Sequence, residues 1–349
     1  MIPSQPTYGS SSRLFKRIND EKDVIHFRTK SQAYQQILTY IDLLCGHIHG
    51  TANKVLNHKY TLRELTFVKC AKFFDSLEKL CDETDLSQSK GVASIGRFGY
   101  MAFRDWFDCM KEACKNFVDN ELAQNHSEQL KAELFHYISE SFGNRMRIDY
   151  GTGHELYFII FTMGLVNIIE TQSGDFGSTS EQILKTTSTS RLASFVKEHG
   201  WDIHALFSHK YLRLCRRIQT KFRLEPAGSR GVYNMDDFQF LPFLFGAAQL
   251  SGVKYIQTTD FYLPEQVDMF KNDFIFFEAV DFILNNKRGP FNEHSYTLWC
   301  LTNLGPWESI YRRIKMKFTN DILGPFPIVQ HFLFGDYVLI WDPVEQGNP

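Results

Sequence analysis

The 349-residue chain lacks several patterns that would place it in a narrow class of proteins. Its seven cysteines are odd in number and include no Cys-x-x-Cys pair, which argues against a disulfide framework and a zinc ribbon. Its net charge is only -2, so no overall positive field attracts nucleic acid. No apolar run reaches the roughly 20 residues that a membrane span needs. We expect a protein of the cytoplasm, with the nucleus as a further location, that has neither a nucleic-acid nor a membrane partner.

Strict alternation of apolar and polar residues is also scarce, so helical periodicity is the main pattern. Residues 154–169 (HELYFIIFTMGLVNII) are apolar nearly all round, and we expect them to form a buried central helix. The content of 43% hydrophobic and 22% charged residues is ordinary for a globular protein. We predict an all-α fold, one large domain over residues 13–345. Apolar residues recur at helical spacing in residues 30–46, 61–81, 103–117 and 203–222.

Three segments have compositions unlike the helical regions. Residues 1–12 are rich in Pro and Ser, and we expect a mobile lead-in. Residues 171–190 are rich in Ser, Thr and Gly, and we expect an exposed insertion. The terminal residues 346–349 (QGNP) are interpreted as an expression remnant. A basic run at helical spacing is interpreted as a solvated helix face; it comprises Arg213, Arg216, Arg217, Lys221 and Arg223.

Four segments concentrate glycine, proline and polar residues beside apolar helices, as ligand clefts do. They are residues 142–155, 225–243, 289–295 and 324–335. In the first, the turn around Thr152 and Gly153 would let backbone N–H groups approach an anion, and Arg147 could add a phosphate contact. A capped turn without a ligand remains an alternative. The P-loop and Rossmann patterns are absent, and Phe158 occupies the place of the second histidine of an HExxH zinc motif.

The second segment contains the adjacent carboxylates Asp236 and Asp237. Magnesium prefers such hard oxygen ligands, but the same pair would also serve as an N-cap before the apolar residues 238–245. Both interpretations stay open. Residues 227–231 approach a nucleophile elbow, yet no strand precedes them, so Ser229 is expected to be a turn residue. The last two segments are rigid Gly-Pro-Phe turns that carry polar side chains beside aromatic ones.

Several of these segments, in order, resemble the signatures of the phosphotyrosyl phosphatase activator family, also called the protein phosphatase 2A activator family. The matching stretches are RIDYGTGHE (147–155), EPAGS (225–229), GV (231–232), DDFQFLPF (236–243), GPF-EHS (289–295) and QHF-FG (330–335). The resemblance runs from about residue 97 to residue 335. It implies an all-helical fold with core, linker and lid lobes, which agrees with the helical periodicity.

The resemblance also implies a site for ATP and Mg²⁺. It places Arg147, Thr152 and Gly153 around the phosphates, and Gln330, His331 and Phe332 toward the rest of the nucleotide. It places magnesium near Gly231 and Asp237. Tyr233-Asn234-Met235 stands where many members have Trp-Gly-Leu, which leaves the lid shape and peptide preference open.

The activity implied by the resemblance is activation of the protein phosphatase 2A catalytic subunit, and of related phosphatases, together with peptidyl-prolyl cis-trans isomerisation. The isomerase would bind proline-containing segments in a cleft formed by residues 236–243 and 289–295, with candidate catalytic residues Asp236, Phe291, Glu293 and His294. Rotation about a peptide bond faces a barrier of about 18–20 kcal/mol, which a dry groove and oriented dipoles lower without a nucleophile. The alternative is a non-enzymatic, ATP-dependent assembly chaperone that clamps the phosphatase catalytic subunit.

Overall fold

The computed structural model describes residues 13–53, 62, 64–87, 100–172, 189–228 and 234–341. This part of the chain is mainly helical and its strands are two residues long, which confirms the predicted all-α class. The expected lead-in, the terminal remnant and residues 173–188 of the expected insertion lie outside the described residues. Thr171 and Gln172 belong to the end of one helix, whereas Thr189 and Ser190 begin the next.

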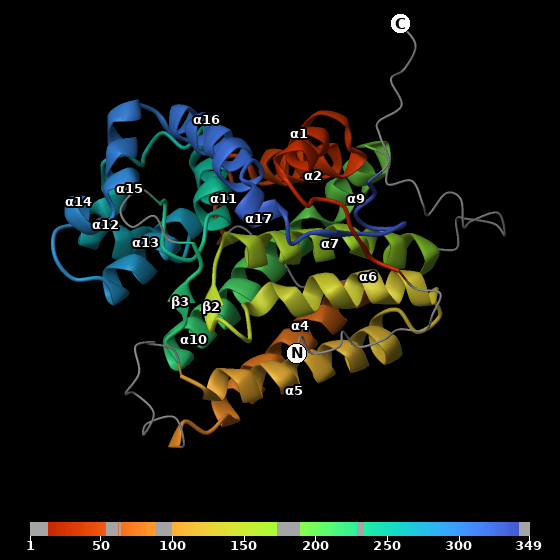
Figure 1. Ribbon diagram of the computed structural model, residues 1–349. Helices are drawn as coiled ribbons and strands as arrows, with labels where there is room; N and C mark the ends of the chain where they lie inside the picture. The colour runs from red at the N-terminus through yellow and green to blue at the C-terminus, as the bar shows by residue number, and fades with distance from the viewer. Residues whose placement is uncertain are drawn as a thin grey trace, which may run out of the picture.

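In Figure 1, α4 to α7 lie side by side, α11 to α16 gather at the upper left, and α1, α2 and α9 are seen above α7. The first part of the chain forms α1 (Glu21–Lys30), α2 (Gln32–Ile48), α4 (Leu65–Glu83), α5 (Ala102–Phe117), α6 (Glu128–Ser139) and α7 (Thr152–Gln172). It continues with α9 (Thr189–Ala205), η4 (Leu206–Tyr211) and α10 (Leu212–Phe222). The second part forms α11 (Leu241–Leu250), α12 (Pro264–Phe270), α13 (Ile275–Asn286), α14 (Phe291–His294), α15 (Tyr296–Leu301), α16 (Trp307–Lys317) and α17 (Phe326–Val329).

Helix α7 is the predicted central helix and extends beyond the expected range by a few residues at each end. It is long and apolar enough to cross a membrane by composition alone, but 89% of its apolar window is buried inside the protein. Aromatic rings pack closely against it, and the ring of Phe158 stacks on that of Tyr211 with centroids 4.0 Å apart. Neighbouring elements cover every side of the helix, as an all-round apolar surface requires.

Two arginines of the basic run on α10 pair with acidic residues of α4, which the sequence did not predict. Arg213 bonds Glu78 at 2.8 Å, and Arg217 pairs with Asp82. Lys210, one turn earlier in η4, bonds Asp75 at 2.6 Å. Each residue is separated from its partner by 135 positions, so the two helices run in the same direction. The solvated-face interpretation holds for Arg213, Arg217 and Arg223, which are exposed, and each surface ion pair contributes about 0–1 kcal/mol.

Two pairs of short strands bring distant segments together. β1 (Phe15–Lys16) is antiparallel to β4 (Leu333–Phe334), and β2 (Asp149–Tyr150) is parallel to β3 (Glu225–Pro226). A Cβ atom added at Gly151 would lie 2.9 Å from the Cβ of Ala227, so glycine is required for this close approach. The pairings place the start of α7 beside the second motif segment and the N-terminal strand beside the last one.

Candidate functional site

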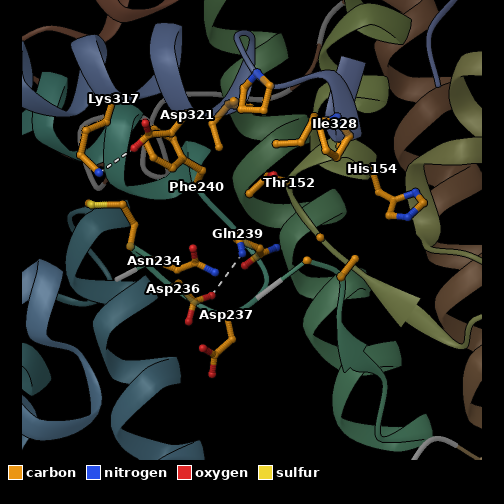
Figure 2. Close-up of a pocket in the computed structure, with 18 of the residues that line it drawn as sticks. Thr152, His154, Asn234, Asp236, Asp237, Gln239, Phe240, Lys317, Asp321 and Ile328 are labelled. Carbon is orange, nitrogen blue, oxygen red and sulfur yellow. Dashed lines mark hydrogen bonds and ion pairs between the residues drawn. The ribbon is translucent and has the colours of Figure 1, made fainter. Parts of the chain in front are cut away.

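A cavity of about 1350 Å³ lies where the motif segments meet. Its walls come from the start of α7, from residues 234–240, from α15 and α16, and from residues 325–333 (Figure 2). Residues 144–153 and 330–333 are far apart in the sequence but line the same cavity, and Tyr157 of α7 bonds the backbone of His331. The volume exceeds that of common small-molecule pockets, which hold about 300–1000 Å³. The cavity therefore has room for more than one ligand group.

Most of the predicted nucleotide residues line this cavity. They are Arg147, Thr152, Gly153, Gln330 and His331. Phe332 does not line it, because its side chain is fully buried and packs edge-on against Tyr157 behind the wall. The Tyr157 hydroxyl donates a hydrogen bond of 2.5 Å to the carbonyl oxygen of His331. In this position Phe332 supports the wall rather than contacting a ligand.

The predicted catalytic residues divide between the cavity and its surroundings. Asp236 lines the cavity, as does the predicted magnesium residue Asp237, whereas Phe291, Glu293 and His294 do not. The ring of Phe291 is stacked on that of Tyr262, with centroids 6.1 Å apart.

One lysine links the predicted magnesium residue Asp237 to the predicted catalytic residue His294. Lys287 lies 2.8 Å from Asp237, and its ammonium donates to the carbonyl oxygen of His294 at 3.4 Å. The segment containing residues 289–295 leads directly into α15, whose Tyr296 and Cys300 line the cavity. Residues 289–295 thus position the part of the cavity wall that α15 forms. Gly231, the other predicted magnesium residue, lies outside the described residues.

One end of the cavity suits an anion. Arg147 is 48% exposed and donates through Nε to Asp149 Oδ2 at 2.6 Å. His331 lies near this arginine; burial, followed by the positive charges of Arg147 and Lys16, lowers its pKa. Burial also lowers the pKa of His154 to about 4, so both imidazoles are favoured in the neutral form. The positive charge at this end comes from Arg147 and Lys16, beside the positive end of the α7 dipole.

The adjacent aspartates have different surroundings. Asp236 Oδ2 accepts hydrogen bonds of 3.2 Å from the backbone N–H groups of Phe238 and Gln239, and burial raises the pKa of this carboxyl. Asp236 therefore caps a turn. The N-cap interpretation fails for α11, which begins only at Leu241.

The carboxyl that caps α11 comes from α7. Glu155 Oε2 accepts hydrogen bonds of 2.9 Å from the N–H groups of Phe240 and Leu241. Its side chain is completely buried, and this burial raises the pKa of the carboxyl to about 8. Glu155 thus fixes the point at which the wall segment 234–240 joins α11.

The donor set fits magnesium only together with a phosphate ligand. Among the described residues, no three His, Cys, Asp or Glu side chains lie close enough to hold a metal ion. Asp236 and Asp237 still supply the one or two carboxylates that Mg²⁺ combines with water and phosphate oxygens. They are the residues of this wall that would hold it.

Sequence reasoning missed several residues of the cavity wall. Lys16 belongs to a short strand without a motif and reaches the cavity only through the pairing of β1 with β4. Arg313 and Lys317 lie on α16. Lys317 bonds Asp321, one turn later, at 2.6 Å, an ordinary helical pattern that gives no sign of a cavity.

Comparison with known proteins identifies the family. The family model for the phosphotyrosyl phosphate activator (PTPA) protein matches residues 14–341. A serine/threonine-protein phosphatase 2A activator of Drosophila melanogaster is 32% identical over 90% of this chain and 72% of its own length. A probable activator of this kind from Dictyostelium discoideum is 30% identical over 93% of this chain and 89% of its own.

The fold also matches that of a solved structure. The crystal structure of the PP2A phosphatase activator Ypa1 has a TM-score of 0.74 and 24% identity, and the match covers 95% of this chain and 96% of that one. At this identity the likeness shows the fold. The family match spans nearly the entire described chain, including every segment of the cavity wall. This chain therefore belongs to the phosphotyrosyl phosphate activator (PTPA) family.

Proposed function

We propose that this chain activates protein phosphatase 2A by binding its catalytic subunit, and that it uses ATP and magnesium held in the cavity. The family membership and the names of the curated relatives support the partner. The proposal includes related phosphatases, peptidyl-prolyl isomerisation of proline-containing segments, and action in the cytoplasm and nucleus. The observation that carries the proposal is the cavity, where the N-terminus of α7 shares one space with the basic residues Arg147 and Lys16 and the carboxylates of Asp236 and Asp237.

The start of α7 has room for a phosphate group. A Cβ atom added at Gly153 would meet no atom closer than Ile328 Cγ2 at 3.9 Å, so the protein's own packing does not require glycine there. Backbone N–H groups of the first helical turn have no partner within the helix and attract anions. Bound ATP would supply negatively charged phosphate oxygens, and Mg²⁺ would supply the positive charge that balances them. Arg147, Lys16 and the N-terminus of α7 would hold and orient the phosphates. Asp149 Oδ1 is buried without a hydrogen-bond partner among the described residues, and it would accept a hydrogen bond from a hydroxyl or amino group of the nucleotide.

Substitution of Gly153 by alanine is expected to weaken ATP binding about tenfold, because the added methyl group keeps phosphate oxygens away from the backbone N–H groups. The fold should be unaffected, since alanine is the better helix former by about 1 kcal/mol. Gly151→Ala is the matched control: its methyl group would collide with Ala227 and lower the melting temperature. Calorimetric titration with ATP and thermal unfolding separate the two effects. Wild-type ATP affinity in Gly153→Ala would contradict this site.

The isomerase part of the proposal rests on the wall around Asp236. Met235, Phe240 and Leu301 form apolar surface beside this carboxyl, which gives the low-polarity surroundings that a twisting amide needs. The non-enzymatic chaperone is the second candidate. The observation in its favour is that Phe291, Glu293 and His294 lie outside the cavity wall, so three of the four predicted catalytic residues would not reach a peptide there.

We expect the wild-type chain to raise the activity of the isolated phosphatase catalytic subunit only when ATP and magnesium are present, because the nucleotide completes the shared surface. Gly153→Ala should need more ATP for the same activation. A steady-state isomerisation assay on a short proline peptide separates the two candidates: turnover supports the isomerase, and binding without turnover supports the chaperone. Activation that is independent of ATP would refute the role of the cavity.

A further inference from the structure

The side-chain amide of Gln239 is a polar group of the cavity that none of the roles above uses. Gln239 lines the cavity and is only 3% exposed. Its Nε2 atom is buried without a hydrogen-bond partner among the residues that the structure describes. Its backbone N–H group donates to Asp236 Oδ2 at 3.2 Å, which holds the residue in place beside the carboxyl (Figure 2). A buried donor without an acceptor is unfavourable, so it points to an acceptor that the free protein lacks.

The surroundings of Gln239 favour a neutral acceptor over a phosphate oxygen. Asp236 and Asp237 lie three and two positions away in the same wall, and their carboxylates would repel a phosphate oxygen that is not bound to Mg²⁺. Lys287 already pairs with Asp237 at 2.8 Å. The basic residues Arg147 and Lys16 lie near His331, and Arg147 lies near His154 at the start of α7, where a phosphate is favoured. Met235 and Phe240, which line the same wall, are apolar and buried.

We propose that Gln239 Nε2 donates a hydrogen bond to the carbonyl oxygen of the residue that precedes proline in a bound peptide. The amide before proline has no N–H group, so it offers an acceptor without a donor. The unpaired group of Gln239 is a donor, and the two are complementary. The inference rests on the proposed binding of proline-containing segments and adds the residue and the atom that recognise them.

This hydrogen bond acts on binding rather than on turnover. The planar amide carries partial negative charge on its oxygen through resonance, and the twisted amide carries less of it. A donor at the oxygen therefore stabilises the bound planar peptide more than the transition state, and it lowers KM without raising kcat. Gln239 is a specificity-determining residue in this reaction, and its loss should raise KM and leave kcat unchanged or higher.

The test uses Gln239→Leu, which removes the donor and keeps a similar volume. Two capped peptides serve as probes: one contains a single Ala-Pro bond, and the other has sulfur in place of the alanine carbonyl oxygen, which is a weaker acceptor. We expect the wild-type chain to bind the oxygen peptide up to about tenfold more tightly than the sulfur peptide, the loss of one hydrogen bond. The leucine variant should bind the two peptides equally. The two proteins and two peptides form a double-mutant cycle, which isolates the interaction between the Gln239 donor and the peptide oxygen.

Thermal unfolding and a second amide provide the controls. The leucine variant should be as stable as the wild type or more stable, because the unpaired donor is gone. Asn234→Leu removes another amide of the same wall and should keep the preference for oxygen. If leucine at position 239 lowers stability, Gln239→Glu replaces the donor by an acceptor of the same shape and should also lose the preference.

Two outcomes overturn the inference and are distinguishable. A preference for oxygen that persists in both Gln239 variants would mean that the amide does not contact the carbonyl. Failure of the wild-type chain to bind either peptide would refute the proposed peptide function itself.

Discussion

Glu155→Leu is expected to lower the free energy of unfolding by about 3–5 kcal/mol. The carboxyl is fully buried, and its Oε2 atom accepts from two backbone N–H groups at the start of α11. Leucine fills the space but leaves both donors unpaired, at about 1–3 kcal/mol each. Since these donors belong to residues 240 and 241, the adjoining cavity wall should also lose its fixed course. Chemical denaturation measures the first effect, and titration with ATP measures the second.

Glu155→Gln is the matched control and should remain close to the wild type at neutral pH. Its amide oxygen can replace Oε2, and Oε1 has no hydrogen-bond partner among the described residues that the new NH₂ group would disturb. Burial raises the carboxyl pKa from 4.5 to about 8 in the folded protein. The folded state therefore prefers the neutral acid, a preference whose contribution is full below pH 4.5 and is lost as pH rises through 8.

The pH dependence of this pair provides the sharper measurement. From pH 5 to pH 9, the wild type should lose stability relative to Glu155→Gln, because only the wild type must bury a negative charge at the upper end. A leucine variant as stable as the wild type, or a constant difference between wild type and glutamine variant over this range, would contradict the assigned role.

The sequence predicted the helical class and the central helix because both depend on local periodicity. Residues 154–169 are apolar on every side, and such a segment in a globular chain is stable only when neighbours surround it. The motif segments also identified much of the cavity wall, including Arg147, Thr152 and Asp237. Glycine and proline interrupt the periodicity at these places, and a ligand cleft is one reason for such an interruption.

The role of Glu155 could not be predicted, because its hydrogen-bond partners lie 85 and 86 positions further along the chain. The sequence offered Glu155 only as part of a failed zinc motif. The N-cap interpretation of Asp236 and Asp237 failed for the same reason. Local spacing indicated a helix directly after them, but the chain turns first, and a remote carboxyl determines where the helix begins.

Residues 289–295 show a different limit of sequence reasoning. Their composition suits a cleft, yet Phe291 packs on Tyr262 and the segment lies outside the cavity wall. A rigid turn that exposes aromatic rings and one that buries them have the same local sequence pattern. The tertiary contacts of Tyr262 decide between them, and nothing in the spacing of residues 289–295 reports those contacts.

Glu133→Ala is expected to destabilise the protein by about 4 kcal/mol or more and to weaken ATP binding. Glu133 Oε1 accepts from Asp336 N–H and Oε2 accepts from Val338 N–H, both at 2.8 Å, and Tyr337 N–H is shared between the two oxygens. Alanine leaves three backbone donors unpaired, and those of Tyr337 and Val338 are buried. It also removes the anchor of residues 335–338, which continue directly from β4. Because β4 pairs with β1, release of this segment should displace Lys16 from the cavity.

The glutamine variants of the two buried glutamates should behave differently, although both side chains are buried carboxyls. Both oxygens of Glu133 accept backbone N–H groups, whereas only one oxygen of Glu155 has such partners. In Glu133→Gln the new NH₂ group must face a backbone N–H, and two donors in contact should cost about 2 kcal/mol. Denaturation curves of Glu133→Gln and Glu155→Gln, measured at the same neutral pH, test this difference. Equal free energies of unfolding for the two variants would contradict this prediction. The number of carboxyl oxygens that accept backbone N–H groups would then not determine how strongly each glutamate stabilises the fold.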